Sequence, residues 1–156
     1  MKQFATLAAT LCVAALTIAA APATAQNVTY NTYNSGTNTV NTTYNIVTTN
    51  NSAITNFVTG ANVTGALGYN TSAMNISGGK VSEAAGYDTS TMTISGGSVP
   101  SAYSNDNSTT SISGGNVTDA IALGTSTTSI SGGNVTNAYA SNTSTLNISG
   151  ANMSAV

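Results

Sequence analysis

The chain has 156 residues, of which only 4% are charged: two Lys or Arg, four Asp or Glu, and no His. A formal net charge of −2 argues against nucleic acid as a partner, because phosphate binding depends on clustered Lys and Arg. With no His and a single Cys, the usual general bases, thiol nucleophiles and transition-metal ligands are missing. We therefore predict a protein that is not an enzyme and holds no cofactor or metal.

The N-terminal segment has the three parts of a secretory signal peptide. Lys2 is followed by an alanine-rich apolar run over Phe4–Ala21 and by the small residues Ala23-Thr24-Ala25. This pattern predicts a signal peptide over residues 1–25 and a secreted chain, extracellular or at the cell surface, that begins at Gln26. The alternative is an uncleaved membrane anchor, which the weakly hydrophobic Ala and Thr residues of the run disfavour. Cleavage would remove Cys12, so we expect a mature chain with no thiol and no membrane insertion.

Residues 26–49 are rich in Asn, Thr and Tyr and alternate only in part, for example at Val40, Thr42 and Tyr44. Alternation of this kind indicates extended structure. The segment is predicted to be either an irregular N-terminal coil or a flexible arm, and both alternatives stay open at this stage.

Residues 50–156 contain an 18-residue repeat whose most recognisable phrase is Ile-Ser-Gly-Gly-x-Val. Its copies are Ile76–Val81, Ile94–Val99, Ile112–Val117, Ile130–Val135 and the degraded Ile148–Met153. Val58–Val63 aligns with the first of these and suggests a sixth copy. Because each repeat buries its apolar side only against its neighbours, the pattern predicts an all-β fold, a β-solenoid (parallel β-helix) of about five to six coils.

Aligned copies predict which side chains face the interior of each coil. In the copy around Ile94, side chains alternate along a strand, so Ile94, Met92 and Ser90 should point inward, and Thr89, Thr91, Thr93 and Ser95 outward. The Gly-Gly pair should form a corner, with Val99 beginning a second inward row and Ala102 a third. Three short sides per coil are therefore expected, stacked about 4.8 Å apart.

The C-terminal end of the repeat shows no polar capping element after Ile148. An uncapped solenoid end presents unpaired backbone N–H and C=O groups, which can act as a template for another chain. We therefore expect self-association.

Two constellations in the repeat have both a chemical and a structural interpretation. Asp88 and Asp106 share one column, like a paired-carboxylate site, although Asn and Gly in the same column favour a turn over calcium binding or catalysis. The tyrosine pairs Tyr69/Tyr87 and Tyr103/Tyr139 could grip sugar rings, but packing at a corner is favoured.

Outward threonines form the most regular predicted surface. The candidate surface ladder is Thr71, Thr89, Thr91, Thr109, Thr125, Thr127, Thr143 and Thr145. These Thr-x-Thr columns resemble the ice-binding face of insect antifreeze β-solenoids, and the resemblance implies that hydroxyls and methyls hold ordered water against ice. Ala73 and Asn107 interrupt the array, and no disulfides rigidify it.

The repeat phrase Ile-Ser-Gly-Gly-x-Val-Thr is similar to repeats of secreted bacterial β-solenoids, including autotransporter passengers and surface adhesins. That resemblance implies a structural or adhesive role at the cell surface and carries over no catalytic residue. The leading hypothesis is a secreted adhesive or structural subunit that self-assembles end to end into fibres. The alternatives are an ice-binding protein and a solenoid that binds carbohydrate, such as a cell-surface glycan.

Overall fold

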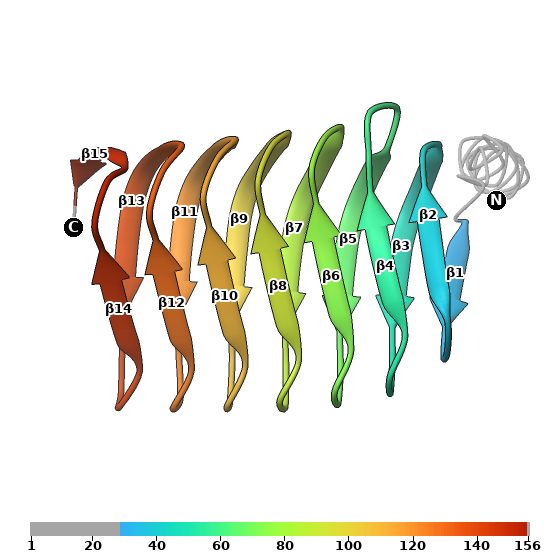
Figure 1. Cartoon of the computed structure of the whole chain (residues 1–156), viewed down its shortest axis with the longest axis horizontal. Coiled ribbons are helices and arrows are strands. Elements are labelled where there is room, and N and C mark those ends of the chain that lie inside the picture. The colour runs from blue at the N-terminus through green and yellow to red at the C-terminus, as the bar shows by residue number, and fades with distance from the viewer. Residues whose placement is uncertain (1–28, 156) are drawn as a thin grey trace, which may run out of the picture.

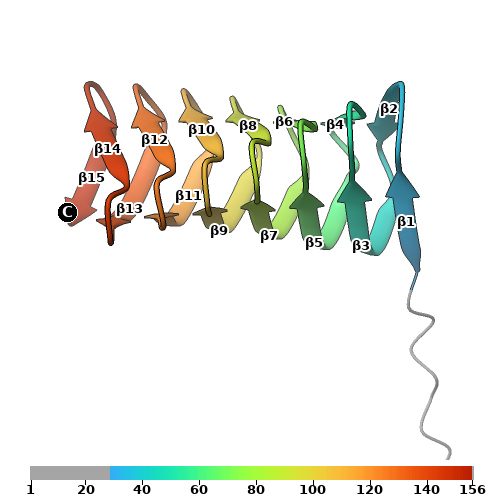
Figure 2. The same ribbon diagram turned by 90° about the horizontal axis from the view of Figure 1, so that it is seen from below.

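A computed structural model describes residues 29–155, so the predicted signal peptide lies outside the described residues. These residues form an all-β solenoid of about seven turns of roughly 18 residues, with strands and turns and no helix. Figures 1 and 2 show the strands stacked along one long axis, with the N-terminal coil at one end and the C-terminal coil at the other. The predicted fold class is confirmed.

The chain passes alternately through two parallel sheets. Six seven-residue strands, with a four-residue strand at each end, form an eight-stranded sheet: β1 (Tyr30–Tyr33), β3 (Thr43–Thr49), β5 (Asn62–Gly68), β7 (Lys80–Gly86), β9 (Ser98–Ser104), β11 (Asn116–Ala122), β13 (Asn134–Ala140) and β15 (Asn152–Ala155). Strands of four residues form a seven-stranded sheet: β2 (Thr37–Val40), β4 (Ile54–Phe57), β6 (Ala73–Ile76), β8 (Thr91–Ile94), β10 (Thr109–Ile112), β12 (Thr127–Ile130) and β14 (Thr145–Ile148). We call these the long-strand sheet and the short-strand sheet.

Equivalent residues of successive repeats are direct partners in the sheets. In the short-strand sheet, Ile112 pairs with Ile94 on one side and with Ile130 on the other. All three side chains are 0% exposed, and Met92 and Ser90 are also buried. The inward and outward assignment read from the columns is thus confirmed.

The expectation of three sides per coil is wrong: each full turn has two strands. Val117 and Ala120 are both buried on the single strand β11, although they are three residues apart. Thr118 and Asp119 between them both avoid the interior, so the strand bends there, and the sheet pairing omits Thr118. The predicted second and third inward rows therefore lie on one continuous strand, which is bent between them. It also accommodates Pro100, which has no N–H to donate at the equivalent position.

The number of coils and the alignment of the weakest copy also need correction. There are about seven turns instead of five to six, because residues 30–49 form β1, β2 and β3 within the same two sheets.

Phe57, and not Val58, pairs with Ile76 and is fully buried. The segment from Phe57 to Ile76 is one residue longer than the repeat. Figure 1 shows that the loop between β4 and β5 rises above the other loops of that edge.

The glycine pair between the two strands of a coil is required by the close approach of neighbouring coils. Gly133 has a φ of 82°, a conformation that costs little only for glycine. A Cβ on the preceding Gly132 would lie 2.6 Å from the carbonyl oxygen of Ser113 in the coil before it. The second glycine of the pair therefore sets the corner, and the first permits the stacking distance.

The interior is apolar on one side and lined with hydroxyls on the other. Ile, Val and Ala columns form the continuous core, extended at its N-terminal end by Phe57, Val40 and Val47. In the hydroxyl-lined part, the Ser104 hydroxyl bonds those of Thr110 and Thr128, the latter at 2.9 Å. The column of Thr110 and Thr128 also holds the buried Met92 and Met74.

We expect Ile112→Ala to lower the free energy of unfolding by about 2–5 kcal/mol, because a fully buried side chain in mid-stack would leave a cavity. The matched control Ser111→Ala, at an exposed position on the same strand, should stay within about 0.5 kcal/mol of the parent protein. Urea unfolding followed by circular dichroism measures both. Equal effects of the two changes would contradict the assignment of the core.

Candidate functional site

The eight threonines of the predicted ladder separate into two structurally different sets. Four of them, Thr71, Thr89, Thr125 and Thr143, lie in the turns that lead into the short-strand sheet. Their hydroxyls donate to backbone carbonyls of the preceding coil, for example Thr89 Oγ1 to Asn70 O at 3.0 Å and Thr143 Oγ1 to Gly124 O at 3.0 Å. These four form a corner set that ties neighbouring coils together.

The other four threonines stand on strands and point away from the core. Thr109 pairs with Thr91 on one side and with Thr127 on the other, and Thr127 pairs with Thr145. No hydrogen bond among residues 29–155 uses any of their hydroxyls. The next outward column along the strands carries Thr93, Ser111, Ser129 and Asn147. Over β8, β10, β12 and β14, the outer surface of the short-strand sheet, which we call the hydroxyl face, is thus uncharged and lined by Thr, Ser and Asn. Towards the N-terminal end the same column carries Ala73 and the exposed Ile54.

The two sets should respond differently to loss of the hydroxyl. Thr125→Val removes the bond from Thr125 Oγ1 to Asp106 O, 2.9 Å long, and should cost about 0.5–1.5 kcal/mol of stability. Thr127→Val, one position into the strand, should change stability by less than about 0.5 kcal/mol. Thermal unfolding of the two isosteric variants tests this difference. A larger loss for Thr127→Val than for Thr125→Val would show that the sets are wrongly assigned.

Asp88 and Asp106 are turn residues. Both have a φ of 56°, and the same column holds Asn51, Asn70 and Asn142 with similar values. Asp and Asn tolerate this left-handed conformation better than other non-glycine residues. The Asp88 carboxylate accepts a hydrogen bond from the Asn70 backbone N–H at 3.0 Å. Between residues 29 and 155 there is no group of three His, Cys, Asp or Glu side chains arranged to hold a metal ion.

Of the four tyrosines predicted to pair, two stack. The Tyr69 and Tyr87 rings lie 5.0 Å apart with an interplanar angle of 10°. Burial, and then the neighbouring Tyr69, raise the pKa of Tyr87. Tyr103 and Tyr139 share a column but are separated by Ile121 of the intervening strand. Since Tyr69 and Tyr87 cover each other with one ring face each, their geometry indicates corner packing more than a sugar platform.

The C-terminal end of the stack exposes the Ile column that the inner coils bury. Ile148 is 39% exposed, whereas its partner Ile130 is 0% exposed. Leu146 and Met153 are half-buried at the same end. β14 and β15 each have a sheet neighbour on one side only within the described chain. The outermost coil therefore combines an open backbone edge with an exposed apolar interior.

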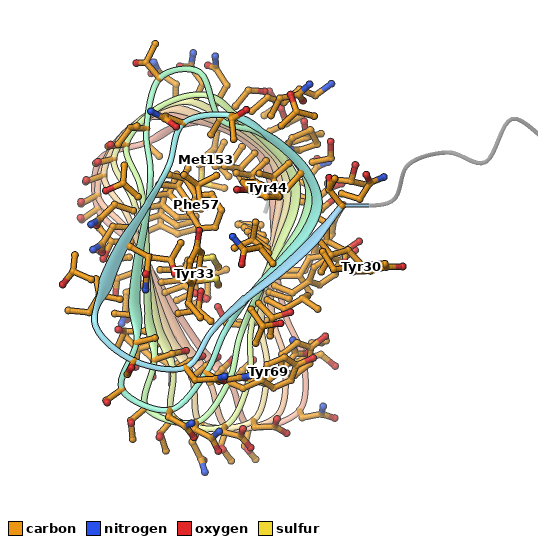
Figure 3. All side chains as sticks on the ribbon, turned by 90° about the vertical axis from the view of Figure 1, so that its right-hand side faces the viewer. Tyr30, Tyr33, Tyr44, Phe57, Tyr69 and Met153 are labelled. Carbon is orange, nitrogen blue, oxygen red and sulfur yellow. The ribbon has the colours of Figure 1, made fainter. Side chains whose placement is uncertain are left out.

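At the N-terminal end of the stack, tyrosine side chains fill the interior of the coil. Figure 3 looks along the solenoid from this end and shows Tyr33 and Tyr44 inside the ring of the coil, while Tyr30 points outward. Asn31 Nδ2 donates to the Tyr33 hydroxyl at 2.8 Å, and Asn38 Nδ2 donates to the carbonyl of Gly36 at 3.3 Å. Burial, and then Tyr44, raise the pKa of Tyr33. Sequence reasoning missed this arrangement, because the repeat is irregular before Phe57; the partial alternation at Tyr44 was its one signal.

Comparison with known proteins identifies no relative: no protein-family model, no curated protein and no solved structure matches the chain. Among residues 29–155, there is no helix with the length and apolar character needed to span a bilayer. A functional interpretation therefore depends on the surfaces described above.

Proposed function

We propose that this protein is a secreted, non-enzymatic structural or adhesive subunit that associates end to end at or outside the cell surface. The observation that carries the proposal is the C-terminal coil, where the Ile ladder ends at a half-exposed Ile148 on a strand with an open edge. Secretion rests on the signal-like segment of residues 1–25.

An open parallel edge of this kind favours addition of another strand. Burying Ile148, Leu146 and Met153 under a second copy would remove apolar surface from water, and each new layer would add backbone hydrogen bonds. Repeat proteins normally cover their outermost coils with polar capping elements to stay soluble. Within the described residues, the C-terminal coil has none.

Charge does not protect either end. The charged side chains of residues 29–155 are Lys80, Glu83, Asp88, Asp106 and Asp119, and all lie on or beside the middle strands β7, β9 and β11. Natural sheet proteins often prevent edge-to-edge pairing by placing Lys or other charges on the edge strand. The end strands β1, β2, β14 and β15 carry no such residue.

A charge placed at the open end should therefore block association. We expect the processed protein to form larger species as its concentration rises, and Ile148→Lys to shift it to monomer. Ser111→Lys adds the same charge at an exposed position of the inner strand β10 and should leave association unchanged. Sedimentation velocity and negative-stain electron microscopy measure the outcome. A parent protein that stays monomeric at all concentrations and forms no fibres would contradict the proposal.

A second function, ice binding, is favoured by one specific observation. The hydroxyls of Thr91, Thr109, Thr127 and Thr145 make no internal hydrogen bond within residues 29–155 and repeat at the inter-strand spacing of about 4.8 Å. A flat, uncharged array of this kind can order water. The corner threonines, whose hydroxyls are already bonded, would contribute little.

If the hydroxyl face binds ice, the protein should shape ice crystals and lower the freezing point below the melting point. Thr127→Tyr should abolish both effects because the bulky ring disrupts the array. Thr118→Tyr, at an exposed position on the long-strand sheet, should leave them intact. Nanolitre osmometry of the three proteins provides the measurement, and normal ice growth with the parent protein would rule the function out.

A further inference from the structure

A stripe of aromatic and aliphatic side chains runs along one side of the solenoid, on the outer surface of the long-strand sheet. We call it the tyrosine stripe; its members are Leu67, Tyr69, Ala85, Tyr87, Tyr103, Ile121, Leu123 and Tyr139. We infer that the tyrosine stripe binds an arginine-containing segment of another protein. Neither the ends of the stack nor the hydroxyl face is part of this surface, so such binding would be a further function.

The stripe combines two neighbouring columns of the repeat. In one column, direct partners follow each other from Leu67 of β5 to Tyr139 of β13. The other column is the residue after each long strand, which bonds the preceding coil, as in Tyr87 N to Gly68 O at 2.9 Å. Asn105 is the one polar residue of this second column between Tyr87 and the next coil. Residues two apart on a strand face the same side, so both columns face outward, and the stripe is about 19 Å long over its five coils.

Side chains of the stripe pack on one another outside the core. Ala85 stands between Leu67 and Tyr103 in an outward column and is nevertheless 0% exposed. Its neighbour Ala84 belongs to the core, whereas Ala85 does not. An outward alanine is buried only when larger neighbours cover it, so the stripe is a cohesive external patch. Apolar patches on an outer surface mark interaction sites, and tyrosine is enriched in protein interfaces.

All four Asp and Glu side chains of the sequence border the tyrosine stripe, two on each side. Glu83 and Asp119 share the adjacent outward column and lie two residues before members of the stripe on the same strands. Asp88 and Asp106 occupy the left-handed turn position on the other side. Aromatic surface and negative charge are therefore combined on this side of the solenoid.

The carboxylates keep acceptor capacity for a ligand. Hydrogen bonds among residues 29–155 use one oxygen each of Asp88, Asp106 and Asp119, from Asn70 N, Asp88 N and Asn137 Nδ2. None uses Glu83, which is exposed. At least one oxygen of each carboxylate therefore remains available.

The negative charges act on the tyrosine rings as well. Burial, and then Tyr69, Glu83, Asp106 and Tyr103, raise the pKa of Tyr87. Nearby carboxylates have this effect because they disfavour a further negative charge on the phenol. The same field favours a positive charge placed against the rings.

These properties fit a partner that presents guanidinium groups. Arginine stacks on aromatic faces through cation–π attraction and forms paired hydrogen bonds with carboxylates. A second copy of this chain does not supply that chemistry, since from Gln26 onward it has no Arg and Lys80 is its one Lys. Two such stripes would also repel each other through their carboxylates, and the same charges disfavour an anionic lipid surface. The partner is thus a different, basic protein.

A fluorescein-labelled oligoarginine peptide tests this inference by fluorescence anisotropy with the processed protein. We expect saturable binding at low ionic strength that weakens as salt is added, because salt screens exposed charges. An oligolysine peptide of the same length should bind more weakly, since an ammonium group lacks the planar fork that stacks and pairs with carboxylates.

Two substitutions separate the rings from the charges. Tyr103→Leu keeps an apolar side chain beside Ala85 and all four carboxylates, and should lower the affinity for oligoarginine about three- to tenfold. Glu83→Gln removes one exposed charge and should lower the affinity about two- to fivefold with a weaker salt dependence. The matched control is Tyr30→Leu, which changes a tyrosine that is 68% exposed on the same sheet but outside the stripe, and it should leave the affinity unchanged. Circular dichroism checks that each variant keeps the parent fold.

Binding that depends on salt, on Tyr103 and on the guanidinium group supports the inference. Equal binding of the two peptides, or oligoarginine binding unchanged by Tyr103→Leu, would show a general attraction of an acidic protein for cations and would overturn it. Retention on neutral cellulose that resists high salt and is lost in Tyr103→Leu, without oligoarginine binding, would make the stripe a sugar platform instead. Absence of any binding by the folded parent protein would equally overturn the inference, while end-to-end association would stand or fall on its own measurement.

Discussion

The structure depends on one constraint: each coil must lie directly over the last, with equivalent residues paired. Backbone hydrogen bonds run from coil to coil even at the corners, as in Ser113 N to Ile94 O at 2.9 Å and Asn116 N to Gly97 O at 2.9 Å. Because the strands are parallel and in register, any change in one column is felt by the neighbouring coils. This is why the corner glycines and the Ile, Val and Ala columns recur so faithfully.

That constraint also decides where the molecule has surfaces to use. Sides of the stack are internally satisfied: the turns are closed by Asp, Asn and Thr, and Tyr69 stacks on Tyr87. The hydroxyl face and the two ends are the surfaces on which groups without a partner in the described chain are arranged in regular rows. The ends differ in kind, since Tyr33 and Asn31 fill the interior at one of them, while Ile148 is left uncovered at the other.

End-to-end association and ice binding place different demands on the same scaffold. The first uses the open edges and the exposed end of the core, and the second uses the outward column of Thr91, Thr109, Thr127 and Thr145. Both benefit from the scarcity of charge, which leaves edges unprotected and the hydroxyl face neutral. A polymer of such coils would also extend the hydroxyl face along its length.

Column reading of the sequence was sufficient for the fold class and for the inward residues, because strand alternation and an 18-residue period leave little freedom once Ile94 is placed inside. Tertiary structure decided what periodicity does not encode. A strand that bends between Val117 and Ala120 looks in sequence like two separate strands, and only the continuous pairing shows one. Phe57, and not Val58, occupies the Ile column because the loop between β4 and β5 holds one residue more than the repeat. Thr125 bonds a carbonyl of the preceding coil, whereas the hydroxyl of Thr127 makes no internal bond. The difference depends on whether such a carbonyl lies within hydrogen-bond distance, and only the stacking of the coils determines that distance.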